Sequence, residues 1–321
     1  MKKNTKGWLL LAAALILGGL LLFGVAMTMN HWDFSLLGSA KYEARTVDIN
    51  DGFRNISIRT DEDDIVFLPS GSGKCRVEFY ERDKVTHSAE VKGATLTIGV
   101  NDTRGPLDHI GLFSVGSPKI TVYLPQREYA SLVIEGDTGD VELPKAFRFE
   151  SIAITADTGD VECQASASGP VGIHLSTGSI TLGSASAGQL DLSVSSGDVD
   201  VYSVDCAGDV KLSVSTGKAV LSDLSCRSFL SDGNTGSILL TNVIAADRIN
   251  IERSTGDVEL DRCDASELYI TTDTGDVRGT LLSEKVFLTQ SDTGRIDVPK
   301  TISGGRCEIS TDTGDITMTV K

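Results

Sequence analysis

The sequence predicts an all-β chain: a single-stranded, right-handed parallel β-solenoid of 19–20-residue coils, preceded by one N-terminal transmembrane helix. Three observations lead to this prediction. A Thr-Gly or Ser-Gly pair recurs ten times at a spacing of 19 or 20 residues, aliphatic residues keep fixed positions around each pair, and an uncharged apolar segment stands near the N-terminus. A constant period of about 20 residues is typical of solenoids, in which each coil packs only on its neighbours.

The apolar segment at residues 7–29 contains no charged side chain and follows Lys2, Lys3 and Lys6. A helix of this length can cross a hydrocarbon core of ~30 Å. By the positive-inside rule, the lysines place the N-terminus in the cytoplasm. We therefore expect a cytoplasmic tail at 1–6, a single-pass signal-anchor in the cell membrane at 7–29, and a linker at 30–41. A cleaved signal peptide is the alternative, although its apolar region normally spans only about 7–15 residues.

Residues 42–130 are rich in strand patterns but less regular than the rest. Residues 56–67 resemble a coil whose corner has lost its glycine, and strands are predicted at 75–80, 95–98 and 119–124. We expect this part to cap the N-terminal edge of the solenoid. The regular solenoid follows at residues 131–321, where the chain ends inside the last coil and is expected to leave an open edge.

The glycine of each recurring pair is expected to form a tight corner, because glycine accepts a positive φ without steric cost. The Asp, Ser or Asn two residues earlier can hydrogen-bond the backbone of the same turn. The ten structural turn glycines are Gly139, Gly159, Gly178, Gly197, Gly217, Gly236, Gly256, Gly275, Gly294 and Gly314.

Aliphatic residues flank each corner two and four residues after the glycine, and seven and five residues before it. They alternate with polar residues, which is the period of a strand with one buried face. The column five residues before the glycine has two exceptions, Ser231 and Thr289. A third inward segment is expected to begin seven residues after each glycine, so each coil should be roughly triangular in section. Stacking the coils would bury these columns in one continuous core.

The six cysteines of the chain suggest a disulfide framework in an exported protein. Five of them, however, replace aliphatic or small residues at inward positions, which favours buried free thiols. Cys206 and Cys226 share a column on adjacent coils and are close enough to allow a bond. Zinc is not expected, because there is no Cys-x-x-Cys pair.

Aspartates around the corners are the best candidates for a ligand site, since carboxylates stacked at ~5 Å repel and calcium binds oxygen ligands. Turn capping is the favoured alternative, because uncharged Ser and Asn occupy the same corner in other coils. Apart from this calcium candidate, no cofactor is expected. The weak calcium candidates are Asp137, Asp140, Asp157, Asp160, Asp273, Asp276, Asp292, Asp312 and Asp315.

Nucleic acid is not expected as a partner, because the net charge is −16 and the sequence shows no segregated basic patch. Catalysis is not expected either. None of the histidines, His31, His87, His109 and His174, stands beside a recognisable nucleophile and orienting acid. A polysaccharide-acting enzyme remains a remote alternative, since it would need a cluster of acidic and basic residues on one outer face.

The repeated Asp-Thr-Gly-Asp-Val motif, the segment Ile-Val-Phe-Leu-Pro at 65–69 and the segment Ile-Thr-Val-Tyr-Leu-Pro at 120–125 show a resemblance. With the N-terminal anchor, residues 42–321 resemble a bacterial β-strand-repeat family labelled putative adhesins, a domain of unknown function. The resemblance implies a surface or envelope protein without catalytic residues. Some relatives are encoded with regulators of cell-envelope stress.

These observations favour a non-enzymatic, membrane-anchored protein of the bacterial cell surface. The solenoid would lie outside the cytoplasmic membrane as an adhesin or scaffold that binds a surface glycan or an envelope protein. The alternative is an accessory protein of the envelope-stress response that acts through a membrane partner.

Overall fold

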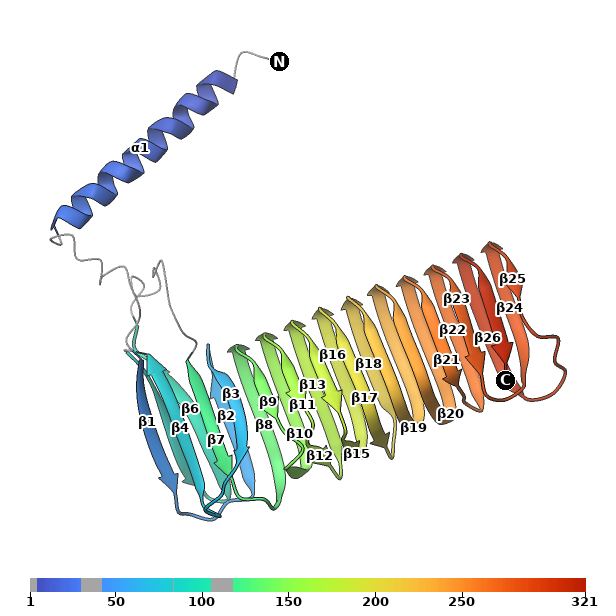
Figure 1. Cartoon of the computed structure of the whole chain (residues 1–321), viewed down its shortest axis with the longest axis horizontal. Helices are drawn as coiled ribbons and strands as arrows, with labels where there is room; N and C mark the ends of the chain where they lie inside the picture. Colours follow the sequence, from blue (N-terminus) through green and yellow to red (C-terminus); the bar gives the residue numbers. More distant parts are fainter. Residues whose placement is uncertain (1–4, 30–41, 83, 105–117) are drawn as a thin grey trace. The chain divides into compact units, whose positions relative to one another are not determined.

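The computed structural model describes residues 5–29, 42–82, 84–104 and 118–321. These residues form two units, each of which is described by itself. One unit contains helix α1 (Thr5–Met29), and the other contains Tyr42–Asp102 together with Ser117–Lys321 (Figure 1). Residues 1–4 of the predicted tail, the predicted linker at 30–41 and the histidines at 31 and 109 lie outside the described residues.

Helix α1 is present where the sequence predicts a helix, and it has 25 residues. Its large apolar side chains, among them Trp8, Leu15 and Leu22, are exposed. Among the residues that the structure describes, however, no helix meets the length and hydropathy needed to cross a membrane. The predicted transmembrane segment at 7–29 is therefore supported as a helix and not as a membrane span.

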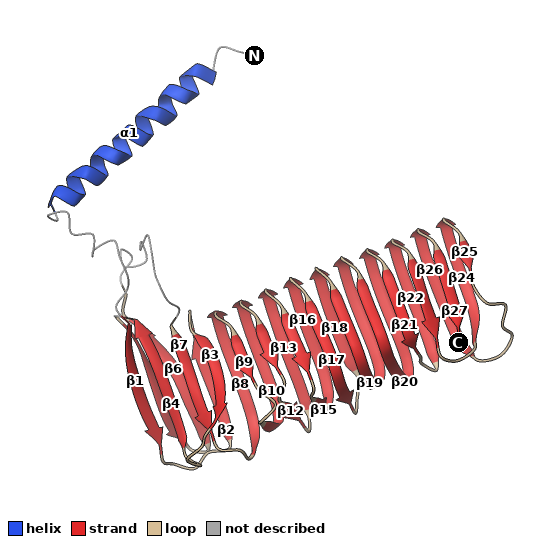
Figure 2. Ribbon diagram, in the orientation of Figure 1, coloured by secondary structure: helices blue, strands red, loops and turns tan. Residues whose placement is uncertain are grey.

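The second unit is all-β, and its strands belong to one continuous sheet wound into stacked coils (Figure 2). Each coil has three sides. The first side ends at the Thr-Gly corner, and the second side begins after it. The third side is either a short strand or part of a long strand that continues into the sides before and after it. Strands leading to the corner are β8 (Glu128–Thr138), β10 (Arg148–Thr158), β13 (Pro170–Thr177), β16 (Gln189–Ser196), β18 (Val210–Thr216), β22 (Glu267–Thr274), β24 (Lys285–Thr293) and β26 (Gly305–Thr313). Strands that follow the corner are β9 (Val141–Leu143), β11 (Val161–Cys163), β14 (Ile180–Gly183), β17 (Val199–Cys206), β21 (Val258–Cys263), β23 (Val277–Leu281), β25 (Ile296–Asp297) and β27 (Ile316–Val320). The third side contains β12 (Ser166–Ala167) and β15 (Ser186–Ala187), whereas β19 (Ala219–Thr235) and β20 (Ile238–Thr255) run through all three sides.

The corners lie above one another, as the repeat predicts. Through the regular coils, the residue before each corner glycine pairs in parallel with its counterpart on the next coil, for example Thr158 with Thr177 and Thr216 with Thr235. The same register holds in the other pairs of these coils. The predicted parallel β-solenoid is thereby confirmed, and its right-handed sense stays a prediction.

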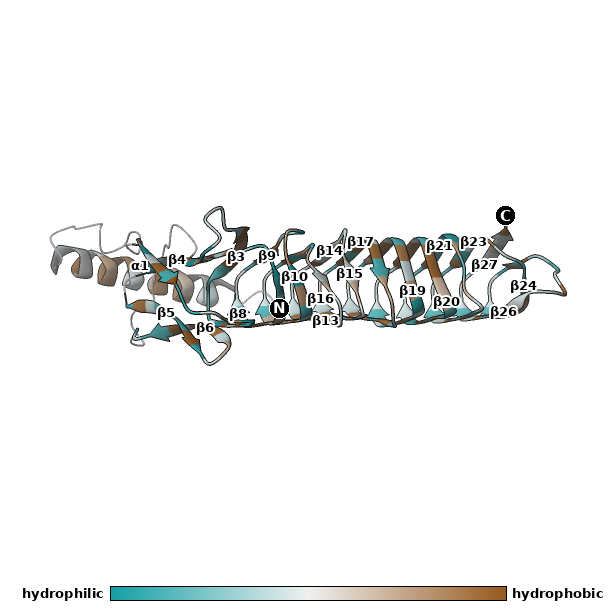
Figure 3. Cartoon of the chain, turned by 90° about the horizontal axis from the view of Figure 1, so that it is seen from below, coloured by the Kyte–Doolittle hydropathy of each residue, from teal (hydrophilic) through white to brown (hydrophobic). Residues whose placement is uncertain are grey.

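The core consists of the predicted aliphatic columns, which form one cluster along the stack. Val199, Leu221 and Ile238, for example, are fully buried. Figure 3 shows the hydrophilic and hydrophobic residues alternating along the strands. Burial of these columns is the main source of stability, because apolar area is worth roughly 25 cal/mol per Å².

The third side begins with a second corner that the sequence analysis did not identify. Ser184, Ser203, Asp223, Asn242 and Arg262, each six residues after a corner glycine, have φ between 52° and 54°. This left-handed conformation turns the chain and sets the inward register that follows. In coils without this left-handed residue, the first inward side chain of the third side is not the one seven residues after the glycine, as the sequence predicts. Phe147, Ala165 and Leu281 are buried there instead of Ala146, Ser166 and Leu282.

The last coil does not form the C-terminal edge, so the predicted open edge at the chain end is wrong. Strand β26 pairs with β22 on one side and with β24 on the other, and β27 likewise pairs with β23 and β25. The tenth coil is thus inserted between the eighth and the ninth, and β24 and β25 end the stack (Figure 1). The coils share the same pattern of inward columns. The tenth coil can therefore pack on the eighth coil in the place that the ninth would otherwise take. Glycines let the chain enter the gap: an added Cβ at Gly304 would overlap the carbonyl oxygen of Glu284.

The N-terminal part forms the expected cap and is also stacked out of sequence order. Strands β2 (Asn55–Thr60) and β3 (Asp64–Pro69) form the glycine-free coil and pair with β8 and β9. On their outer side they pair with β6 (Thr95–Asp102) and β7 (Lys119–Leu124), which come later in the chain. Antiparallel strands complete the cap: β1 (Tyr42–Ile49), β4 (Cys75–Arg82) and β5 (Val85–Lys92).

Candidate functional site

The corner glycines occupy the conformation that the sequence predicts for them, with one exception. Nine of the ten have a positive φ, for example 142° at Gly159 and 128° at Gly236, and Gly294 in the end coil does not. The corners also contact one another closely. A Cβ added at Gly178 would overlap the carbonyl oxygen of Gly159. The Thr-Gly rows are therefore a structural seam.

The aspartates that follow the corner glycines act as hydrogen-bond acceptors between coils. The carboxylate of Asp140 accepts the backbone N–H of Asp160 (2.8 Å), and that of Asp160 accepts the N–H of Ser179 (2.8 Å). Near the C-terminal end, Asp276 accepts the N–H of Asp315 (2.8 Å), and Asp315 in turn accepts that of Arg295. Each carboxylate thus accepts a hydrogen bond from a backbone N–H of the adjacent coil. These hydrogen bonds account for the position of the carboxylates without a bound ion.

The aspartates that precede the Thr-Gly pairs are exposed, namely Asp137, Asp157, Asp273, Asp292 and Asp312. Among the residues with a described structure, no group of three or more His, Cys, Asp or Glu side chains is arranged to hold a metal ion. The structure therefore brings none of the weak calcium candidates together into such a group.

All six cysteines are free and buried, which confirms the preference for thiols over a disulfide framework. Burial raises the pKa of Cys163 and Cys226 to about 12. At neutral pH these thiols are protonated and act as small apolar side chains.

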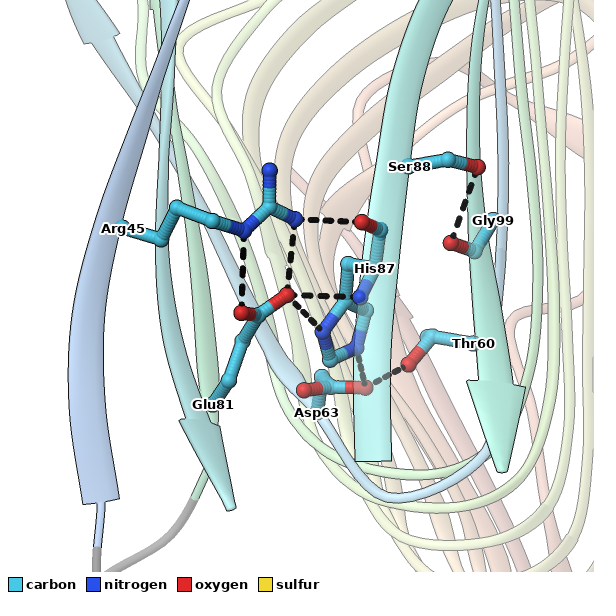
Figure 4. Close-up of polar contacts among 7 residues, drawn as sticks. All are labelled: Arg45, Thr60, Asp63, Glu81, His87, Ser88 and Gly99. Atoms are coloured by element: carbon cyan, nitrogen blue, oxygen red, sulfur yellow. Dashed lines mark hydrogen bonds and ion pairs between the residues drawn. The ribbon is translucent and has the colours of Figure 1, made fainter. Parts of the chain in front are cut away.

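A buried polar cluster lies inside the cap, where the sequence analysis found no site (Figure 4). The ring of His87 lies between two carboxylates: its Nε2 is 2.9 Å from Asp63 Oδ2 and its Nδ1 is 3.3 Å from Glu81 Oε1. Glu81 also accepts two hydrogen bonds from Arg45, at 3.0 and 2.8 Å, and the hydroxyl of Thr60 donates to Asp63. The side chains of His87 and Asp63 are only 1% and 2% exposed.

The cluster contains two acidic and two basic side chains, and their interactions shift the pKa values of His87 and Glu81. Burial acts to lower the pKa of His87, but the hydrogen bond and charge of Asp63, with the charge of Glu81, raise it above its ordinary value. Burial acts to raise the pKa of Glu81, but Arg45 and the His87 N–H lower it overall. The His87 ring lies against Oδ2 of Asp63, whose second oxygen, Oδ1, has no hydrogen-bond partner among the described residues.

This cluster is more suited to holding the cap together than to catalysis. It joins β1, β4 and β5 to the turn between β2 and β3, and Arg45 also lies over the Phe79 ring at 4.8 Å. The sequence signal was the acidic run Asp61-Glu62-Asp63-Asp64, which stands where the other coils have Thr-Gly. Its partners come from a different part of the chain, so sequence reasoning could not assemble the cluster.

A second buried polar site explains one of the exceptions in the aliphatic columns. Arg253 points into the core, is 4% exposed, and donates from Nη2 to the hydroxyl of Ser231 at 2.9 Å. Gly233 makes room for it, because a Cβ there would overlap the guanidinium. Burial lowers the pKa of Arg253, and its Nε has no partner in the described part of the chain. Ser231, Gly233 and Arg253 therefore form one coordinated substitution within the core.

Two cavities follow the third side of the coils, and the columns that line them define a groove there. One cavity, of about 390 Å³, is lined by residues such as Ser186, Ala207 and Ser225, and another, of about 610 Å³, by residues such as Ala246 and Ser266. Both sets stand eight to ten residues after the corner glycines, so the two cavities follow the same columns. Exposed Arg227, ion-paired with Asp209 at 2.5 Å, stands in these columns between them.

Small side chains shape this groove, and hydroxyls and carboxylates provide its polar groups. The larger cavity ends at Lys285, whose buried ammonium is 2.6 Å from Asp264 Oδ1. Glu284 and Ser283 complete this end. The groove can therefore accept a narrow, extended polar chain and offer it both donors and acceptors.

The described residues do not assemble a recognisable catalytic group. His174 is exposed and has no ion pair with an acid among the described residues. The partners of His87 are Asp63 and Glu81, and neither is a nucleophile activated by the ring. Buried thiols of high pKa are poor nucleophiles.

Comparisons with known proteins identify a family and several structures of similar fold. A family model described as Toastrack DUF4097 matches residues 53–217 and 207–321, and no curated protein gives a significant sequence match. One similar solved structure is a putative lipid binding protein from Parabacteroides distasonis, with 15% identity, a TM-score of 0.47, and coverage of 87% of this chain and 98% of that one. A putative adhesin from the same organism has 12% identity, a TM-score of 0.43 and coverage of 87% and 98%. A putative adhesin from Bacteroides fragilis has 16% identity, a TM-score of 0.34 and coverage of 88% and 100%. Because these TM-scores are below 0.5, the fold assignment rests on the strand pairing described above.

Proposed function

Because this chain belongs to the Toastrack DUF4097 family, whose model covers most of its length, we propose that it is a non-enzymatic binding protein, an adhesin or scaffold. The ligand is an extended surface glycan or a segment of an envelope protein, bound along the groove on the third side of the coils. The observation that carries this proposal is that both large cavities follow the same three columns.

The chemistry of the groove favours a polar polymer over a small apolar ligand. Its floor is made of small side chains on a rigid stack of strands, so binding requires little reordering of the protein. Shallow contacts repeated over several coils add up along one ligand chain. Nucleic acid is a poor fit, because the net charge of −16 repels phosphates and carboxylates such as Asp205 line the groove.

We further propose that the solenoid is displayed outside the cytoplasmic membrane and is attached to it through α1. Support comes from the uncharged segment 7–29 with lysines before it, and from the exposed apolar side chains of Trp8, Leu15 and Leu22. Protease treatment of intact cells and of spheroplasts, with antibodies against the solenoid, measures this. Digestion of the solenoid in intact cells or spheroplasts supports the proposal, and protection until lysis contradicts it.

Binding is best tested with the full chain in detergent on a panel of immobilised glycans and cell-wall polymers. The variants Ala207→Trp and Ala246→Trp place an indole in the groove at exposed positions, so the core is left intact. Ala153→Trp is the matched control, since Ala153 is also exposed but lies on the outer face of β10. We expect the groove variants to lose binding at least tenfold and the control to bind normally. Equal binding by all three would contradict the groove as the binding surface.

Removal of the N-terminal segment separates this function from the envelope-stress alternative. Residues 42–321 without α1 should keep their ligand affinity, because the residues that line the two cavities all belong to the solenoid. Loss of all activity on removing α1, with the solenoid still folded, would favour an accessory protein that acts through a membrane partner.

A further inference from the structure

A small polar cavity lies in the N-terminal cap, apart from the groove on the third side. Its volume is about 310 Å³, and the end of β1, the turn between β3 and β4, and β7 contribute to its wall. The charged residues that line it are Lys74, Arg76 and Asp48. Together with Glu78, which pairs with Arg76, the charges at this cavity balance, whereas the whole chain has a net charge of −16.

The turn that carries Lys74 has the sequence Ser70-Gly71-Ser72-Gly73-Lys74 and is held by its own hydrogen bonds. The N–H of Ser70 donates to the carbonyl oxygen of Leu124 (2.8 Å), and the Ser70 hydroxyl donates to that of Lys74 (2.5 Å). Gly73 supplies the positive φ of the turn, 70°. The backbone of Lys74 is thus fixed, while its ammonium has no hydrogen bond or ion pair within the described residues.

The guanidinium of Arg76 is also held in place. It lies over the ring of Tyr123, 4.4 Å from the centroid, and its Nη2 is 3.1 Å from Glu78 Oε1. The Tyr123 hydroxyl donates to the other oxygen of Glu78 at 3.1 Å. These three side chains fix one another, and the ion pair uses only one of the guanidinium nitrogens. An arginine has five N–H donors, so further donors remain for a ligand.

We propose that this cavity binds a phosphate group, held by the ammonium of Lys74 and the guanidinium of Arg76. These donors belong to a turn and to a strand beside it, and so approach from different directions, which suits a tetrahedral oxyanion better than a planar carboxylate. Asp48, on the opposite strand in register with Arg76, opposes the anion and limits its affinity. The phosphate belongs to a sugar monoester or to a diester of a polymer or lipid headgroup.

Calorimetric titration of the full chain in detergent tests this site with three probes: inorganic phosphate, glucose 6-phosphate and glycerophosphoglycerol. Lys74→Ala should weaken binding about tenfold, the loss of one charge-assisted hydrogen bond. Asp48→Asn should strengthen it, because it removes the opposing charge. Lys211→Ala is the matched control, since Lys211 is an exposed lysine of β18 outside the cavity.

The probes also distinguish the sources of the phosphate. Tighter binding of glucose 6-phosphate indicates a monoester, and tighter binding of glycerophosphoglycerol indicates a diester. Since Lys74 and Asp48 are exposed, neither substitution should change the melting temperature, and Lys74→Gln serves as a second variant if Lys74→Ala does. The proposal is overturned if no probe binds, if the Lys74 variants bind as the wild type does, or if Asp48→Asn weakens binding. Groove variants should leave these affinities unchanged, so the two sites can fail independently.

Discussion

At the scale of single residues, the corner glycines are fixed by two separate requirements. Their φ lies in a region that side chains rarely adopt, and their α-carbons face a carbonyl oxygen of the neighbouring corner. At Gly236 φ is 128°, and an added Cβ would overlap the carbonyl oxygen of Gly217. The residue before the Thr-Gly pair can be Asp or Ser without strain or overlap. The glycine is therefore kept in each of the ten corners, whereas the charge of the preceding residue differs from coil to coil.

Replacing Gly236 by alanine should therefore destabilise the solenoid by ~1–3 kcal/mol, through strain and the steric overlap. Gly99→Ala is the control, because its added Cβ would meet only Ser88 Oγ, at 3.9 Å, and its φ is not positive. Urea denaturation of both variants measures the difference. Equal stability of the two variants would mean that the corners are not in contact.

The buried His87 should make the stability of the cap depend on pH. A histidine whose pKa is raised in the folded state, from its ordinary value of 6.5, stabilises the fold fully below that ordinary value. This contribution is lost as the pH rises through the raised pKa. Glu81 acts in the opposite direction: its pKa is lowered from 4.5, so its contribution is present above pH 4.5 and is lost as the pH falls through the lowered pKa.

We expect the melting temperature of the wild type to decrease from pH 6 towards pH 9 and that of His87→Gln to be lower and flatter over this range. Differential scanning calorimetry at several pH values measures both. His174→Gln is the matched control, since His174 is exposed on β13. A wild-type slope that survives in His87→Gln would assign the pH dependence to other groups.

At the scale of secondary-structure elements, β19 and β20 show how two adjacent coils accommodate a buried arginine, Arg253. The guanidinium of Arg253 on β20 occupies the space that Gly233 on β19 leaves open, and Ser231 supplies its hydrogen bond. A buried arginine without a carboxylate partner is costly by itself. Its cost is limited by the backbone carbonyls of Val214 and Asp232, each 3.4 Å from Nη1.

Gly233→Ala should destabilise the wild type more than it destabilises an Arg253→Val background, where the overlap with the guanidinium is gone and only that with the carbonyl oxygen of Val214 remains. The coupling between residues in contact is typically ~1–3 kcal/mol. A double-mutant cycle by urea denaturation measures it. Additive effects of the two substitutions would show that the side chains do not share this space.

At the scale of the whole molecule, the sequence predicts the structure of a single coil but not the order in which the coils stack. The ten glycines, with the aliphatic columns around them, determine the corner, two of the three sides and the stacking register. The second corner was missed because residues as different as Ser184, Asn242 and Arg262 occupy it. The column pattern cannot order the coils, since each one presents the same surface to both neighbours.

The candidate sites were less predictable than the fold, because they depend on contacts between distant segments. Asp63 and His87 are 24 residues apart and meet only because β2 and β5 both belong to the cap. The cavity near Lys74 likewise requires β1, β4 and β7 together. The aspartates of the corners were visible in the sequence, and the structure assigns several of them to hydrogen bonds between coils.

The stacking of the corners into one solenoid, with the tenth coil between the eighth and the ninth, can be measured by cysteine cross-linking. Thr271 on β22 pairs with Ser310 on β26, at the ~5 Å spacing of adjacent strands, whereas Gln290 on β24 is one coil further away, at ~10 Å. A disulfide cannot bridge the longer distance, and the native cysteines are buried and protonated. We predict that the pair Thr271→Cys and Ser310→Cys oxidises readily and that Thr271→Cys with Gln290→Cys does not. The reverse result would show coils stacked in sequence order, and no cross-link in either pair would contradict the solenoid itself.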